Sequence, residues 1–92
     1  MAITIVIPGT ATATIDERDI ITANLQVQIK RDTTVIGDSI ITINVPLNTA
    51  DLLNFSVAQM ILKINQFKSQ CIKQDNIQTA LSTFTNLVKA GV

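Results

Sequence analysis

The chain has 92 residues, of which 47% are hydrophobic and 15% are charged, and seven basic residues balance seven acidic ones. This length and apolar content predict one folded domain over residues 1–92 and exclude a disordered chain, while the balanced, scattered charges exclude a nucleic-acid-binding protein. The absence of histidine removes the most common general base and the most common transition-metal ligand, which argues against an enzyme and against a metal site.

The N-terminal segment, residues 3–15, reads ITIVIPGTATATI and alternates strand-forming residues on both sides of a Pro-Gly pair. If it closes as a hairpin, a three-residue loop at residues 8–10 gives one wholly apolar face, whereas a two-residue loop mixes Ile and Thr on both faces. The alternative is that residues 3–7 pair elsewhere, including with another chain, because an uncharged edge strand is poorly protected against pairing. Thr4 and Val6 are therefore candidate interface residues.

Two longer strands are predicted next. Residues 20–29 alternate apolar and polar side chains, which is typical of a strand with one buried face. A further strand is predicted over residues 35–45, where the later isoleucines share one face but Ile36 has the opposite parity. A bulge near Gly37 would reconcile the two parities, and a second turn at Gly37-Asp38 is the alternative.

The second half of the chain predicts two amphipathic helices, over about residues 49–71 and about residues 76–90. Asn48 is a suitable N-cap for the first helix. Asp75 and Gln78 have the spacing of a capping box at the start of the second helix. The predicted break between the two helices therefore lies just before Asp75.

Together these elements predict an α+β fold, an antiparallel sheet of three to four strands over about residues 2–45 with both helices packed on one face. The last helix has one apolar stripe, which needs one surface to cover. The first helix carries a second stripe opposite its main one, made of Phe55, Ala58 and Leu62. Either the final helix or the N-terminal strand covers this second stripe within the chain, or it meets a partner chain, which makes these three residues candidate interface residues.

No residue cluster indicates catalysis, a cofactor or a metal ion. Cys71 lies on the main apolar stripe of the first helix without a basic neighbour, so we expect a core residue rather than a nucleophile. The acidic run at residues 16–19 lacks the ligand spacing and the glycine of a calcium loop, so it is expected to be a solvated connection between strands. The three glycines are isolated and form no phosphate-binding loop.

The predicted function is that of a non-catalytic structural or protein-interaction subunit that self-assembles, for which a component of a larger particle such as a phage is one concrete form. Its low charge leaves little repulsion between neighbouring copies. The alternative is a small binding module that holds an apolar ligand or peptide between the sheet and the helices. We expect a homo-oligomer. No nucleic-acid partner is expected from the balanced charges, and no membrane partner is expected because the apolar runs are too short to span a bilayer. The single cysteine fits a reducing location, in the cytoplasm or within an assembled particle.

Overall fold

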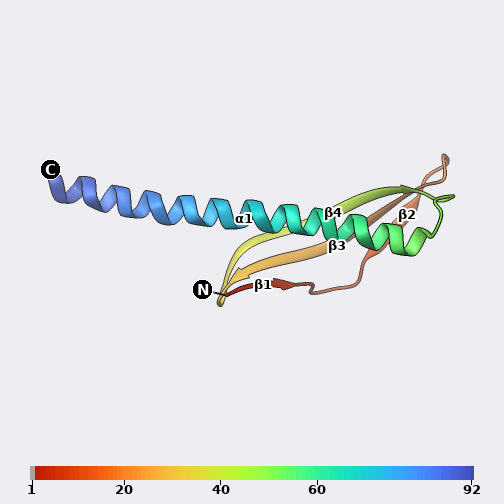
Figure 1. Cartoon of the computed structure of the whole chain (residues 1–92), viewed down its shortest axis with the longest axis horizontal. Helices are drawn as coiled ribbons and strands as arrows, with labels where there is room; N and C mark the ends of the chain where they lie inside the picture. Colours follow the sequence, from red (N-terminus) through yellow and green to blue (C-terminus); the bar gives the residue numbers. More distant parts are fainter. Residues whose placement is uncertain (1) are drawn as a thin grey trace.

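The computed structural model describes residues 2–92, so Met1, the first residue of the predicted domain, lies outside the described residues. It contains a four-stranded antiparallel sheet followed by one long helix (Figure 1). The elements are β1 (Ile3–Val6), β2 (Thr12–Ile15), β3 (Ile20–Arg31), β4 (Thr34–Pro46) and α1 (Leu52–Gly91). The α+β class agrees with the sequence, but the predicted pair of helices is a single helix.

Strand β3 is the centre of the sheet, because every other strand pairs with it. On one side, β4 follows β3 through a tight turn at Asp32, whose φ of 54° lies in the left-handed region that Asp tolerates better than most residues. On the other side, β1 and β2 lie end to end, with Ile3 paired with Arg31 and Ile15 paired with Ile21. The sheet is therefore narrow, with β3 flanked by β4 and by one short strand at a time.

The hairpin considered at residues 8–10 does not form, and the alternative, in which residues 3–7 pair elsewhere, is confirmed by the pairing of β1 with β3 of the same chain. β1 and β2 run in the same direction, both antiparallel to β3, and residues 7–11 loop out between them opposite residues 25–27. The long β3 offers enough backbone donors and acceptors for both short strands. This pairing also keeps the alternating isoleucines of β1 on the same face as the apolar residues of β3, which satisfies the same burial requirement as the predicted hairpin.

The conflict of parity in β4 is resolved by a bulge, as predicted. The pairing shifts between Ile29 and Lys30, so that Gly37 pairs with Ile29 and Val35 pairs with Lys30. Ile36 is the extra residue, and it packs against the buried core. The bulged Ile36 and the later Ile41 and Ile43 thereby reach the same side of the sheet, although Ile36 has the opposite sequence parity.

The second half of the chain forms one helix, α1, and the predicted break just before Asp75 is wrong. Residues 72–75 contain no glycine or proline, so nothing in them forces the helix to end. The carboxylate of Asp75, expected to cap a new helix, instead lies 3.1 Å from Nη1 of Arg31 at the end of β3. The start of α1 also differs, because the helix begins after Asp51 rather than at Asn48.

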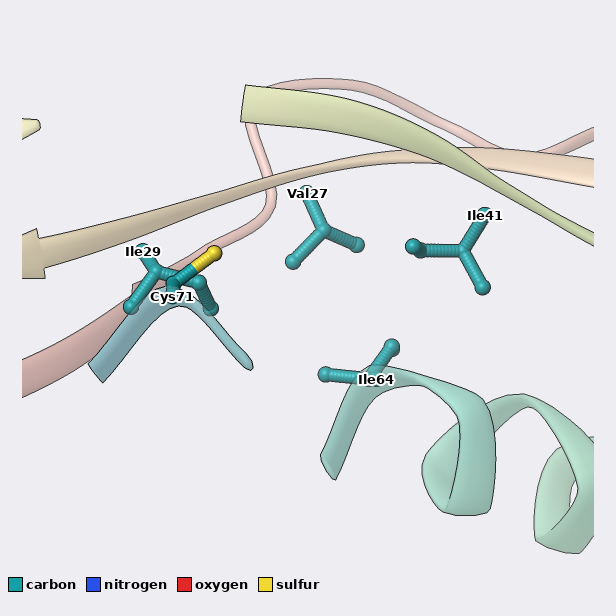
Figure 2. Close-up of a cluster of buried hydrophobic side chains, with 5 residues drawn as sticks. All are labelled: Val27, Ile29, Ile41, Ile64 and Cys71. Carbon is teal, nitrogen blue, oxygen red and sulfur yellow. The ribbon is translucent and has the colours of Figure 1, made fainter. Parts of the chain in front are cut away.

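The buried core lies between α1 and the sheet. Its central cluster consists of Val27, Ile29, Ile41, Ile64 and Cys71 (Figure 2). Cys71 is only 4% exposed, which confirms its predicted place in the core. The backbone of β4 approaches α1 so closely that a Cβ atom at Gly37 would collide with Sγ of Cys71. A glycine in this strand therefore permits the close approach of helix and sheet.

α1 is longer than the sheet and runs past its end (Figure 1). We call residues 52–75 the anchored segment and residues 76–91 the free segment, because every residue from 76 to 92 is exposed. The radius of gyration is 18.3 Å, whereas a compact domain of this length has about 12 Å. Within the described residues, no helix combines the length and the apolar character needed to cross a membrane.

Candidate functional site

The residues that the sequence offers for chemistry are Cys71 and the acidic run at residues 16–19. Burial raises the pKa of the Cys71 thiol, so the reactive thiolate is disfavoured. Among residues 2–92, no group of three or more His, Cys, Asp or Glu side chains could hold a metal ion. In the acidic connection between β2 and β3, Asp16 accepts hydrogen bonds from the Ile20 backbone N–H and the Arg18 guanidinium, both at 3.0 Å, and these bonds lower the pKa of Asp16. This carboxylate therefore organises a turn.

The candidate interface residues Thr4 and Val6 lie in β1, at an edge of the sheet. They pair with Lys30 and Gln28, so they share the sheet face that points away from α1. β1 pairs with β3 of its own chain on one side, and no strand among residues 2–92 pairs with its other side. The outer edge of β1 is thus open, and its contact with another chain stays a prediction.

The candidate interface residues Phe55, Ala58 and Leu62 lie on the anchored segment outside its buried side, and Phe55 borders a pocket with Ile43 and Pro46 of β4. All three are exposed, and Phe55 and Leu62 keep 43% and 52% of their accessible surface. The second helix that could have covered them does not exist. The structure does not bring this set together with Thr4 and Val6, which occupy the other face of the sheet.

The free segment carries exposed apolar residues that were not among the predicted interface residues. Its apolar stripe consists of Ile77, Leu81, Phe84 and Val88, with Leu87 beside it. Phe84 is 64% exposed and Leu87 is 69% exposed, so these side chains lie almost fully in solvent. The sequence shows this stripe. With the predicted helix break, however, the last helix would turn back onto the sheet, and its stripe would cover a surface of its own chain. In the structure only the first residue of the stripe, Ile77, lies beside the sheet, next to Val35 and Ile36 of β4, and the later residues of the stripe are exposed.

The side of α1 that faces the sheet changes character at the boundary between the two segments. In the anchored segment this side is apolar, with Ile64 and Cys71 buried. Beyond Asp75, the same side continues through the free segment as Gln78, Ser82, Thr85 and Lys89. The apolar stripe of the free segment lies about 110° around the helix axis from this side, at about 100° per residue. The free segment is therefore not built to extend the packing of α1 on its own sheet.

A second apolar surface without a partner lies between α1 and the edge formed by β1 and β2. It is a groove of about 330 Å³ whose floor and walls include Ile7, Ala11, Ala23, Leu25, Val57 and Ile61. No charged side chain lines it. α1 packs mainly against β4, so the apolar residues near β1 and β2 are less covered. The groove residues come from the loop between β1 and β2, from β3, from the anchored segment and, through Ile43, from β4.

The candidate functional site is therefore a pair of apolar surfaces in one chain, the stripe of the free segment and the groove beside the anchored segment. No charged side chain lines the groove, and Lys89 is the one charged residue between residues 76 and 91. No protein family model, curated protein or solved structure matches the chain.

Proposed function

We propose that the protein is a non-catalytic structural subunit that self-assembles, and that the outward side of α1 is its main contact surface. The observation that carries this proposal is the free segment, whose apolar stripe has no cover among residues 2–92. Soluble monomers rarely expose large contiguous apolar patches, and such patches commonly mark interaction sites. A structural subunit, unlike an enzyme, needs only such a surface to function.

The composition of the free segment also supports a partner. Many of its residues are Thr, Ser or Asn, which have low helix propensity. The hydroxyls of Thr79, Thr83 and Thr85 donate to carbonyls four residues earlier, a bond that slightly destabilises helices. An isolated helix of about this length is marginal in water even when its residues are good helix formers. Packing against another chain would supply the stabilisation that this segment lacks.

The exposed area of the molecule supports the same conclusion. The chain exposes 6569 Å², whereas a compact folded protein of 10.0 kDa exposes about 5,200 Å². The excess of roughly 1,300 Å² is larger than the roughly 800 Å² that each partner buries in a standard protein–protein interface. One self-association contact could thus return the chain to the surface area of an ordinary globular protein.

The mass of the particle in solution, measured by light scattering at two concentrations, tests the proposal. We expect the wild-type mass to exceed 10.0 kDa and the Leu81→Asp/Phe84→Asp variant to fall to 10.0 kDa. The matched control, Ser82→Asp/Thr85→Asp, adds the same charge to the polar side of the free segment and should keep the wild-type mass. A wild-type mass of 10.0 kDa at both concentrations would overturn the proposal.

A second candidate function, the binding of an apolar ligand, is favoured by one observation, which is the uncharged groove of about 330 Å³. Ligand pockets usually add a few convergent polar groups that orient the ligand. Ser56 is the one polar side chain in this lining, so the groove would bind an apolar ligand without fixing its orientation. A wild-type chain that stays monomeric and binds an apolar dye would favour this function over self-assembly.

A further inference from the structure

α1 does not cover the whole apolar face of the sheet. It packs mainly against β4, and it also buries Val27 and Ile29 of β3. The part of this face near β1 and β2 stays more exposed, and Ile15 in β2 keeps 53% of its accessible surface. The groove described above lies in this part of the face, and α1 itself forms one of its sides.

The groove has the shape that receives large apolar side chains. Ala11 and Ala23 contribute only methyl groups, whereas Leu25, Val57 and Ile61 form its apolar walls. No charge in the lining would repel or select a charged partner. A helix that presents a row of Leu and Phe side chains and little charge therefore matches it in chemistry.

The free segment is such a helix. Its stripe repeats with spacings of four, three and four residues, from Ile77 to Val88, which places the four side chains in one row. Lys89 is the one charged residue between residues 76 and 91. The segment cannot fold back onto its own groove without breaking the helix, which runs straight past the Asp75–Arg31 ion pair.

We propose that the groove beside the anchored segment binds the free segment of a second copy of this chain. This inference deepens the proposed self-assembly and rests on it. The free segment of the neighbour would then cover apolar residues near β1 and β2 that α1 of the same chain leaves exposed. Because groove and stripe are different surfaces, the contact is heterologous and extends to a ring or a filament unless two copies exchange segments reciprocally.

Cross-linking between variants that each carry one introduced cysteine tests which surfaces meet. Ile61→Cys places a thiol at the groove, and Phe84→Cys places one on the stripe, while Cys71 stays buried in both variants. With a short bis-maleimide, we expect a mixture of the two variants to form at least about ten-fold more covalent dimer than either variant alone. The chain with Cys71 alone measures the background, and Ser82→Cys in place of Phe84→Cys is the matched control on the polar side.

A variant that fills the groove gives an independent test, in case the loss of Phe84 weakens the contact. Ala11 is exposed in the loop between β1 and β2 and lines the groove. We expect Ala11→Trp to reduce the mass in solution to that of the monomer while circular dichroism shows a folded chain. Thr10→Trp, at the neighbouring exposed position outside the groove lining, should keep the wild-type mass.

The outcomes separate this inference from the proposed function. If Phe84→Cys cross-links to itself as well as it does to Ile61→Cys, or if Ala11→Trp keeps the wild-type mass, the free segments pair elsewhere. Self-assembly then stands and the groove assignment fails. If the wild type is monomeric and the mixture gives no dimer above background, both the groove assignment and the proposed function fail.

Discussion

The anchored and free segments belong to one continuous helix but have opposite distributions of apolar residues. In the anchored segment, Ile64 and Cys71 are buried against the sheet. In the free segment, the corresponding side is polar, and Leu81 and Phe84 lie on another side, exposed to solvent. The difference teaches that an unbroken helix need not have an unbroken apolar face. The anchored segment carries its apolar residues on the side that packs on the sheet, whereas the apolar residues of the free segment are exposed.

The largest expected effect is the contrast between a core truncation in the anchored segment and a matched truncation in the free segment. Ile64 is 7% exposed, so Ile64→Ala removes buried contacts and leaves a cavity. We expect it to lower the free energy of unfolding by about 2–5 kcal/mol. Urea unfolding monitored by circular dichroism measures this change.

Leu81→Ala is the matched truncation, measured at a protein concentration low enough for the chain to be monomeric. Leu81 is 50% exposed, so we expect a loss of less than about 0.5 kcal/mol there. At concentrations where copies associate, the same variant should unfold at clearly lower urea than the wild type, because association stabilises the folded state by mass action. Equal losses for both variants in the monomer would contradict the contrast between the segments.

The close approach of the anchored segment to β4 predicts the next largest effect. A Cβ atom in Gly37→Ala would meet Sγ of Cys71 and the ring of Phe67, so we expect a loss of about 1–3 kcal/mol by overpacking. Gly9→Ala is the control, because no heavy atom lies within 4 Å of the new methyl group. Adding Cys71→Ala to Gly37→Ala should recover part of the lost free energy of unfolding. If the losses of the two single variants simply add in the double variant, the two sites do not touch.

A smaller effect is expected at the boundary between the two segments. Asp75→Asn removes the ion pair with Arg31. The side chain of Asp75 is 15% exposed and that of Arg31 is 30% exposed. We expect a loss of up to about 1 kcal/mol that shrinks as salt is added. Hydrogen exchange should accelerate at residues 72–76 and stay unchanged around Ile64. Acceleration that spreads over the whole of α1 would indicate that the pair holds more than the boundary.

The smallest effect is a pH dependence that originates in the sheet and leaves the contrast between the helix segments unchanged. Hydrogen bonds from the Ile20 N–H and from Arg18 lower the pKa of Asp16 in the folded state, below an unfolded value of about 3.9. The stabilisation is therefore complete above the unfolded pKa and is lost as the pH falls through the folded pKa. Urea midpoints between about pH 5 and pH 2 should show this loss, and Asp16→Asn should reduce it.

Local patterns in the sequence predicted the features that depend on local chemistry. The alternation over residues 20–29 predicts β3, and the parity of Ile36 predicts the bulge in β4. The place of Cys71 in the core and the position of Phe55 and Leu62 on a second side of the helix also follow from helical spacing, which left open whether this second side is covered within the chain. Each of these predictions needs only the period of one element and the requirement to bury one face.

The wrong predictions concern residues whose partners lie far away in the chain. The capping-box spacing at Asp75 is outweighed by Arg31, a residue of β3 that no local pattern connects to it. The Pro-Gly pair suggests a hairpin, but β3 is long enough to pair with both β1 and β2. The stripe of the free segment is visible in the sequence, yet its role depended on a helix break that does not occur.

The central position of β3 has a consequence for how the chain folds during its synthesis. β1 and β2 leave the ribosome before β3, which is the strand that both of them pair with. β2 has no partner until residue 24 has been made and β1 has none until residue 31, and α1, which packs mainly against β4, follows last. The N-terminal strands therefore pass through a period in which they can pair with a neighbouring nascent chain, the characteristic risk of strands whose partners come late.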